Sequence, residues 1–488
     1  MTYNTFQILT NQVLGLAVFW WLSRYLDKSS FGELNWSLAV LTFVTTLLSL
    51  RLEQIVVRNV AAGDDPSGML TLFAGHNFFT GLVFFGVLSI VCYGCPSFGK
   101  QHYLLWILSI SQLLTFWALP FRQLLTGRGA FGWLALLTSV SNLIRTAGLY
   151  VCMIFSTPDL RVVLLLFIVS SLAELVLGAW IVCGRLGIPM GMTDALAAYG
   201  KLLRTSLPQV GMVFLQAGIA RLDWILMGLL STSAHTAEYT FAYRAFELAP
   251  LPLLVLAPML LNRLAREEGR WGIDGEEERS GINGEEGREA VGRKGGRTDA
   301  VFLDRLVRLE LLLATLPTLW LVISWAPMVD LLTGDKYGAS NRWTFLILSC
   351  CIPFQYINNI YWSQEFARNR LSLILSVTAV TGAIVLVGDV ILIPYFSGAG
   401  AAAAFLAAMV VQYILYTRVS GIAKKWEWGR RLLLSMAIAG CSGLAALSIT
   451  HLPILQLFLG TLLYWLLGRV TGSLQTKETV SLWRAGMR

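Results

Sequence analysis

Three polar residues near the end of an apolar segment are spaced to share one face of a helix. Arg51, Gln54 and Arg58 follow one another at i, i+3 and i+7, and side chains at this spacing lie on the same side of an α-helix. Two guanidinium groups on one face match the geometry of phosphate or carboxylate oxygens. The spacing predicts a cationic helix face, and the alternative is that both arginines reach toward lipid headgroups.

Three further arginines lie within apolar segments. Arg145 and Arg221 lie near the middle of theirs, and Arg244 has Glu247 one helical turn later. A charged residue at the centre of a membrane helix costs about 2.5–3.5 kcal/mol on insertion scales. Arg145 and Arg221 are therefore expected to face a partner or a water-filled cavity. For Arg244, a structural ion pair with Glu247 and contact with an anionic ligand both remain open.

Carboxylates within apolar segments could bind a proton or a cation and so couple transport to an ion gradient. Asp223 lies two residues after Arg221, about 200° around a helix, so we expect Asp223 to meet a group on another helix. A structural ion pair and a coupling site both remain open for it. Glu53 and Glu310 are weaker candidates for ion coupling because they lie near the cytoplasmic ends of their segments. The candidates for ion coupling are Asp223, Glu174, Glu247 and Asp389.

Metal and cofactor chemistry have little support in the sequence. The seven cysteines occur singly or in the pairs Cys92/Cys95 and Cys350/Cys351, and the four histidines are scattered. A structural zinc site needs four ligands gathered together. We therefore expect no metal site and no cofactor.

The elements that must position these residues are membrane-spanning helices. Apolar residues make up 56% of the 488-residue chain and charged ones only 14%, a composition typical of polytopic membrane proteins. Windows of about 20 apolar residues, enough to cross a hydrocarbon core, recur along the chain, and we count about fourteen. Backbone groups in lipid are satisfied within such helices, so an all-α fold is predicted. The expected spans are 5–23, 36–57, 70–93, 103–121, 131–155, 162–183, 206–230, 240–262, 306–326, 343–363, 371–393, 399–417, 432–449 and 452–468.

The distribution of positive charge predicts the orientation. Positive charge is retained on the cytoplasmic side of membrane helices, and with both termini placed in the cytoplasm most of the 37 Lys and Arg residues fall on that side. This bias accounts for the net charge of +8 without a nucleic-acid partner. The opposite side receives Arg24, Lys28, Lys100, Arg161, Lys336 and Arg342.

The chain also indicates an internal repeat and one linker. Residues 15–38 align without gaps on 220–243, which suggests two parallel halves of about six helices with the substrate site between them. The Gly-rich, charged segment 267–299 has few apolar residues and is expected to be a disordered cytoplasmic linker. The predicted division is residues 1–200 and 201–420 for the two halves and residues 421–488 for two additional helices and a cytoplasmic tail.

Several short motifs resemble a known family. Phe31-Gly32 at an outer turn, followed by Arg58, is similar to the first helical pair of the Wzx-like polysaccharide flippases. Leu207-Pro208, Arg221-Leu-Asp223, Tyr239 and Ala242-Tyr243-Arg244 resemble that family's later motifs, and "IPYFSGAGAAAA" at 393–404 is similar to its turn between spans 11 and 12. The resemblance covers roughly residues 1–420 and places the chain in a superfamily of drug, lipid-linked oligosaccharide and polysaccharide exporters.

This resemblance implies a flippase that moves undecaprenyl-pyrophosphate-linked oligosaccharide across the bacterial inner (cytoplasmic) membrane by alternating access, for O-antigen or exopolysaccharide synthesis. It implies membrane lipids and a polysaccharide polymerase as partners. A multidrug or cation antiporter of the same superfamily is an alternative, but the arginines within helices offset the candidate carboxylates and so do not favour cations. A membrane polymerase or ligase would need catalytic groups on an outer loop, and the short outer loops offer none, so no enzyme is expected.

Overall fold

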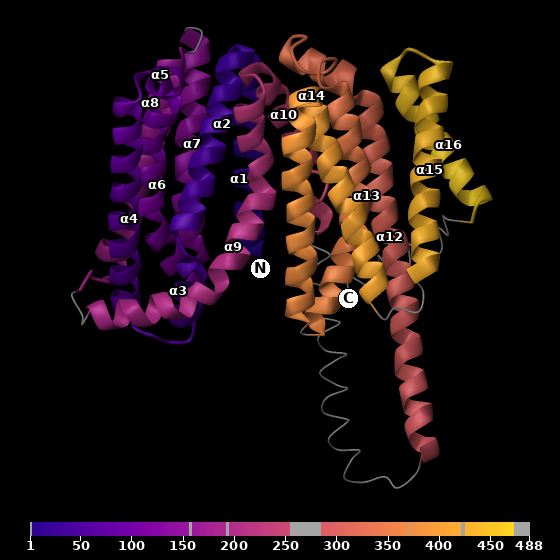
Figure 1. Cartoon of the computed structure of the whole chain (residues 1–488), viewed down its shortest axis with the longest axis horizontal. Coiled ribbons are helices and arrows are strands. Elements are labelled where there is room, and N and C mark those ends of the chain that lie inside the picture. The colour runs from indigo at the N-terminus through magenta and orange to yellow at the C-terminus, as the bar shows by residue number, and fades with distance from the viewer. Residues whose placement is uncertain are drawn as a thin grey trace. The chain divides into compact units, whose positions relative to one another are not determined.

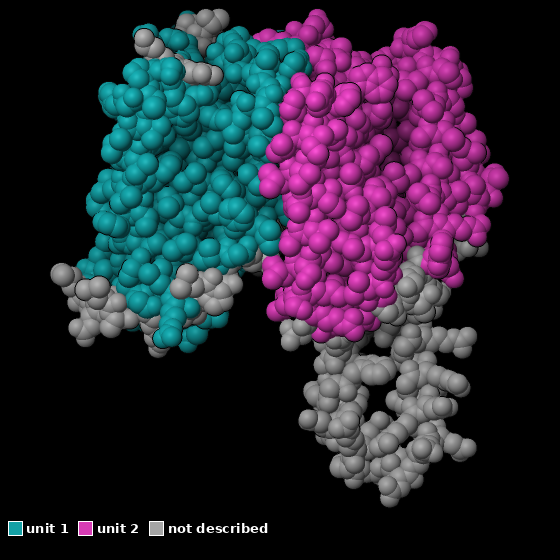
Figure 2. Space-filling model, in the orientation of Figure 1, with its two compact units in different colours: residues 1–240 teal, residues 241–488 magenta. Residues whose placement is uncertain are grey.

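The predicted all-α membrane architecture is confirmed. The computed structural model describes residues 2–155, 159–191, 195–253, 285–368, 370–420 and 425–472, and every regular element in these ranges is helical. Ten of the described helices are long and apolar enough to cross a membrane. The chain forms two compact units, residues 1–240 and 241–488 (Figure 2). The predicted repeat, with halves at 1–200 and 201–420, stays a prediction.

The first unit is a bundle of helices that run side by side (Figure 1). Its last helix, α10, contains the boundary between the two units. The helices are α1 (Thr2–Tyr25), α2 (Lys28–Leu48), α3 (Leu52–Ala61), α4 (Pro66–Gly94), α5 (Pro96–Gln101), α6 (Tyr103–Gly127), α7 (Phe131–Phe155), α8 (Leu160–Ala179), the π-helix η1 (Trp180–Arg185), α9 (Ala195–Leu230) and α10 (Ser233–Phe246).

Aspartate residues fix where three of these helices begin. The carboxylate of Asp27 accepts a hydrogen bond from the backbone N–H of Ser30 at the start of α2, and Asp159 caps α8 in the same way. Asp65 accepts from two backbone N–H groups at the start of α4, where Pro66 is the first helical residue. Such caps satisfy backbone donors that have no partner within the helix, and proline fits at a position that needs no donor.

The expected span 36–57 is wrong at its second half. Helix α2 ends at Leu48, and the chain turns sharply because both Leu50 (φ 48°) and Arg51 (φ 64°) adopt left-handed conformations. Helix α3 then begins at Leu52 as a separate, amphipathic helix. A straight continuation would have kept the polar residues of this segment in the apolar layer, whereas the turn lets α3 bury only its apolar face.

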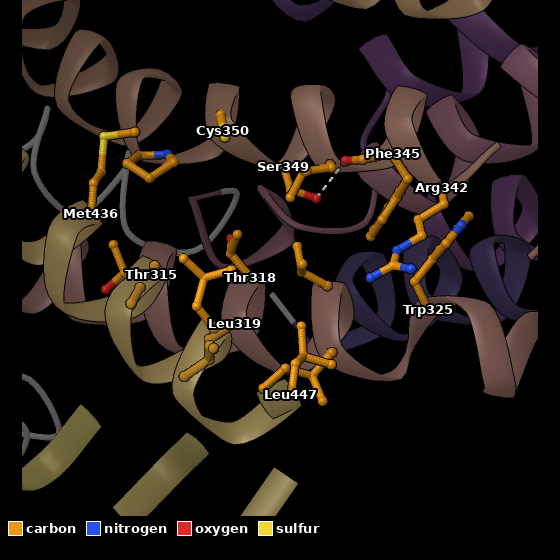
Figure 3. A pocket seen from close by; sticks show the side chains of 18 of the residues that line it. Thr315, Thr318, Leu319, Trp325, Arg342, Phe345, Ser349, Cys350, Met436 and Leu447 are labelled. Atoms are coloured by element: carbon orange, nitrogen blue, oxygen red, sulfur yellow. Dashed lines mark hydrogen bonds between the residues drawn. The ribbon is translucent and has the colours of Figure 1, made fainter. Parts of the chain in front are cut away.

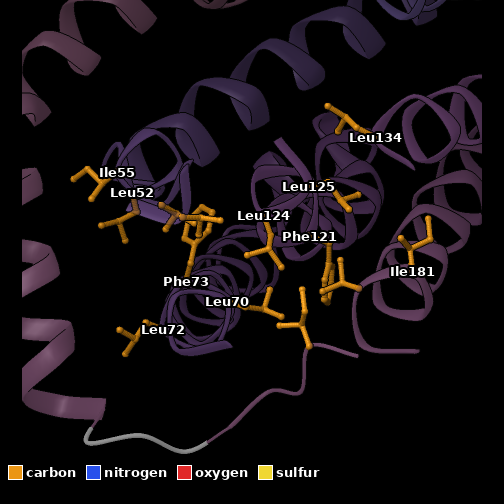
Figure 4. Close-up of a cluster of buried hydrophobic side chains, with 14 of the residues drawn as sticks. Leu52, Ile55, Leu70, Leu72, Phe73, Phe121, Leu124, Leu125, Leu134 and Ile181 are labelled. Atoms are coloured by element: carbon orange, nitrogen blue, oxygen red, sulfur yellow. The ribbon is translucent and has the colours of Figure 1, made fainter. Parts of the chain in front are cut away.

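That apolar face belongs to a hydrophobic core of the first unit (Figure 4). Leu52 and Ile55 of α3 are buried together with Phe73 of α4 and with Phe121 and Leu124 of α6. Burial of apolar side chains contributes roughly 25 cal/mol per Å² removed from water, although within lipid close packing matters more than exclusion of water. The core therefore fixes α3 against α4 and α6, next to the polar residues described below.

Gly32, part of the aromatic-Gly motif, lies at a close contact between helices. A Cβ atom at this position would collide with the backbone carbonyl of Ser233, at the start of α10. Gly228 of α9 is covered by the indole ring of Trp36 from α2, and the Trp36 Nε1–H donates to the carbonyl oxygen of Ile225 over 3.1 Å. Only glycine allows helices to approach this closely, which explains the motif physically.

The second unit has fewer and longer described helices. They are α12 (Glu285–Thr333), α13 (Arg342–Ala367), α14 (Leu371–Val419), α15 (Lys425–Ile449) and α16 (Pro453–Val470). Ser397 interrupts α14 with φ 48° and ψ −128°, so this element contains both expected spans 371–393 and 399–417.

The expected disordered linker is only partly within the described residues. Residues 267–284 lie outside them, and residues 285–299 form the first turns of α12. The helical residues 285–299 continue directly into the membrane-spanning part of α12, which begins at Leu306, and the disordered linker stays a prediction.

Candidate functional site

A polar cavity of about 170 Å³ lies within the first unit, between α2, α3 and α6. Most of its lining is hydroxyl, amide or charged. The polar lining residues are Thr42, Thr45, Thr46, Ser49, Glu53, Gln112, Thr115 and Arg122. One probe sphere of water needs roughly 10–15 Å³, so the cavity can hold several waters or a small polar group.

Two charges meet at the wall of this cavity. Arg122 Nε lies 3.1 Å from Oε1 of Glu174, an α8 side chain that is only 4% exposed. Glu53 interacts electrostatically with both Arg122 and Arg51. Burial raises the pKa of Glu53, and the two arginines partly oppose this shift. Protonation of Glu53 is thus favoured relative to a free side chain, which makes the cavity more positive.

Hydrogen bonds connect Arg145 to the lining of the cavity. From α7 its Nε donates to Ser170 Oγ over 2.6 Å, and an Nη atom donates to Ser171 Oγ over 3.2 Å. Thr115 Oγ1, in the cavity lining, donates to the same Ser171 hydroxyl over 3.0 Å. The guanidinium also lies 4.7 Å from the ring centre of Phe167, in cation–π geometry.

The charge of Arg145 is not used in an ion pair among the described residues. Its hydrogen-bond partners are neutral hydroxyls, and its interactions with Glu174 and Arg122 act at longer range. A partly buried arginine held by neutral groups keeps its capacity to bind an anion. Arg145 and Arg122 therefore form the cationic part of the candidate site.

Arg51 and Arg58 are not among the described residues that line the cavity, although Arg51 interacts electrostatically with Glu53. Arg51 donates from Nε to Gln54 Oε1 over 2.8 Å, but it lies in the left-handed turn before α3 and not within the helix that contains Gln54 and Arg58. Arg58 is exposed in the last turn of α3. Their role in binding a substrate stays a prediction.

Asp223 meets a neighbouring helix, as its position relative to Arg221 predicts. Tyr239 of α10 donates its hydroxyl to Asp223 Oδ2 over 2.6 Å, and the backbone N–H of Trp224 donates to Oδ1. The guanidinium of Arg221 lies 4.9 Å from the ring centre of Trp224. The Asp223–Tyr239 bond therefore explains why these two motif residues occur together.

The other candidates lie in the second unit. Arg244 and Glu247 form an ion pair of 2.7 Å, and each side chain is about one-third exposed. This contact agrees with the structural alternative considered for them. Asp389, on α14, is fully buried.

Arg122 is absent from the candidate residues that the sequence indicates. The expected span 103–121 placed Arg122 in a cytoplasmic loop, but α6 continues to Gly127. The available signal was helical periodicity: Gln112, Thr115 and Arg122 follow one another at i, i+3 and i+10, which places them on one face.

A groove of about 390 Å³ lies within the second unit, between α12, α13 and α15 (Figure 3). Its lining is almost entirely apolar, and Arg342 lies at its edge. Trp325 and Phe345 stack there with ring centres 3.5 Å apart. Figure 3 shows Leu319 and Leu447 among the side chains around the groove, together with Met436. Its volume is within the range of roughly 300–1,000 Å³ that is usual for ligand pockets.

The helical spans define a multi-pass membrane protein that contains a polar cavity lined by Arg122 and an apolar groove. Comparison of the sequence with known protein families identifies the family. The chain belongs to the polysaccharide biosynthesis protein family, whose sequence profile matches residues 1–260. The resemblance deduced from the short motifs is thereby confirmed. No curated protein matches the chain in sequence.

Solved structures with the same fold are transporters. The lipid II flippase MurJ in an inward closed conformation matches with a TM-score of 0.73 and 12% identity, over 96% of this chain and 98% of that one. An inward-facing multidrug resistance MATE family transporter of the MOP superfamily matches with a TM-score of 0.63 and 12% identity, over 88% and 96%. A MOP superfamily transporter from Pyrococcus furiosus, described as having a binding pocket of reverse polarity, has a TM-score of 0.52 and 11% identity, over 88% and 93%.

Proposed function

We propose that this protein is a flippase that moves undecaprenyl-pyrophosphate-linked oligosaccharide across the bacterial inner membrane by alternating access, for surface polysaccharide synthesis. Its termini lie in the cytoplasm, and a polysaccharide polymerase uses the delivered glycan. The observation that carries the proposal is Arg145, a partly buried membrane arginine held by the neutral hydroxyls of Ser170 and Ser171. A pyrophosphate is the chemical group that such a cation favours.

Charge favours this cargo over an organic cation. A cation exporter needs acidic groups free to meet its substrate, whereas Glu174 is occupied by Arg122 and the pKa of Glu53 is raised by burial. The hydroxyl and amide groups of Thr45, Thr115 and Gln112 suit a hydrated polar ligand. Family membership supports the same choice.

The proposal is tested in cells from which the protein is depleted. We expect lipid-linked oligosaccharide to accumulate in the cytoplasmic leaflet, where it is protected from a glycosidase added to intact spheroplasts. Surface polysaccharide should fall in parallel. Unchanged precursor level and leaflet distribution after depletion would contradict the proposal.

The apolar groove supplies the second property that this substrate requires. We propose that it holds part of the polyprenyl chain while the polar part is transported. Gly440 of α15 lines the groove, and a Cβ atom there would contact nothing within 4 Å, so a side chain can be added at this position without a clash at Cβ. A large side chain that displaces part of the prenyl chain would remove its packing contacts with the groove, and within lipid such contacts determine binding.

Gly440→Trp is therefore expected to reduce transport of a long-chain prenyl carrier severalfold and to leave a short-chain analogue unaffected. Rates are measured in vesicles at equal protein. The matched control is Gly86→Trp on α4, since a Cβ atom at Gly86 also meets nothing within 4 Å. If the transport rate fell equally for both carriers, or equally in both variants, the groove would have no role in binding the prenyl chain.

A further inference from the structure

Glu310 is a buried carboxylate that does not belong to the candidate site formed by Arg122 and Arg145. It lies one turn inside the membrane-spanning part of α12, which begins at Leu306, and is 1% exposed. Both of its carboxylate oxygens are inaccessible to solvent, and neither has a hydrogen-bond partner among the described residues. No ion pair to Glu310 occurs in this part of the chain either.

The surrounding helices place titratable groups nearby without pairing them to this carboxylate. Helix α12 packs against α13, α15 and α16. From α13, Tyr356 is close enough to interact electrostatically with Glu310, but its hydroxyl donates to the carbonyl oxygen of Ala249. Arg431 of α15 and Arg308 of α12 both line a small cavity. From α16, Tyr464 shares a hydrogen bond with Thr315.

A second buried glutamate shows the contrasting arrangement. Glu365, at the end of α13, is also 1% exposed, but its two oxygens lie 3.4 and 3.3 Å from guanidinium nitrogens of Arg368 and Arg370. Two guanidinium groups therefore compensate the charge of this carboxylate. Glu310 has no such compensation among the described residues, although it is buried to the same degree.

The energetic consequence is a bound proton. Removing an ionised carboxylate from water without a partner costs several kcal/mol even after relaxation, and the group becomes neutral instead. We propose that Glu310 is a proton-binding site, occupied in the conformation described here and emptied in a conformation that opens α12 to water. Proton binding at this carboxylate thereby links the conformation of the second unit to pH.

The protonated state of Glu310 is tested by infrared spectroscopy of the purified full chain in lipid nanodiscs at pH 7. Glutamate is labelled with ¹³C at its side-chain carboxyl carbon. The label separates glutamate from Asp389. We expect the C=O band of a protonated glutamic acid in the wild type and its loss in Glu310→Gln. Glu365→Gln is the matched control and should keep the band. A band unchanged by Glu310→Gln in folded protein would overturn the proposal.

The same spectra provide a test that needs no variant. Because the site is closed to water, the wild-type band should persist up to a pH at which exposed glutamates are fully ionised. Its absence at pH 6–8 in folded wild-type protein would also overturn the proposal.

Linkage of this proton to translocation rests on the proposed function, and a separate experiment tests it. In vesicles with an imposed pH gradient, wild-type transport should change severalfold with the direction of the gradient, and Glu310→Gln should transport at a rate independent of it. If the variant keeps the wild-type response, the linkage is wrong. If wild type moves no lipid-linked glycan, the proposed function fails, while the infrared result still decides on the proton site.

Discussion

Replacing Arg145 by alanine is expected to lower translocation of the lipid-linked oligosaccharide by about tenfold to a hundredfold. Hydrogen bonds to charged groups contribute about 1.5–3 kcal/mol each, and 1.4 kcal/mol corresponds to tenfold. Among the described residues the side chain donates to Ser170 and Ser171, both neutral, so its charge is available to a pyrophosphate. The measurement is the initial transport rate divided by the amount of inserted protein.

Two further variants isolate the effect of this charge. Arg145→Lys keeps the positive charge but loses the forked geometry, so transport should recover partly. Arg58→Ala removes an exposed arginine of α3 and should change the rate less than Arg145→Ala. Equal activity of wild type and properly folded Arg145→Ala would show that this arginine has a structural role only.

Replacing Arg122 by alanine is expected to destabilise the first unit by about 3–5 kcal/mol, since it leaves a buried charge without its partner. Glu174 is 4% exposed, whereas the Arg122 side chain is 26% exposed and borders the polar cavity. Glu174→Gln should therefore cost less, because water in the cavity can solvate the remaining guanidinium. Thermal unfolding of the purified protein in detergent measures both effects.

A double replacement and a surface control sharpen this prediction. Arg122→Met combined with Glu174→Met removes both charges and should recover most of the stability lost in Arg122→Ala. Arg128→Ala, at an exposed position just after α6, should leave the unfolding temperature almost unchanged. If Arg122→Ala unfolds at the wild-type temperature, the ion pair with Glu174 does not stabilise the protein.

The sequence predicts the membrane helices well, because length and apolar composition alone determine whether a segment can cross a bilayer. The position of Arg145 within a span and the interhelical partner of Asp223 follow from the same periodicity. The turn at Leu50 and Arg51 could not be predicted, since it depends on how α3 packs against α4 and α6.

Burial and pairing of charges depend on contacts between distant segments. Arg122 falls at the edge of an apolar window, where composition cannot distinguish a loop from a helix that continues. Glu310 and Glu365 have similar sequence surroundings, each with arginines within a few residues. Only the structure shows that Arg368 and Arg370 turn toward Glu365, while the oxygens of Glu310 meet no donor in the described part of the chain.

The central claim is tested most directly by translocation in vesicles that contain only the purified protein and a prenyl-pyrophosphate-linked oligosaccharide. A membrane-impermeant glycosidase added outside reports which leaflet holds the glycan. We predict that wild-type protein brings the glycan of the inner leaflet within reach of the enzyme over time, and that Arg145→Ala does so far more slowly. Glycan that stays in its original leaflet with folded wild-type protein, under either direction of an imposed ion gradient, would contradict the account.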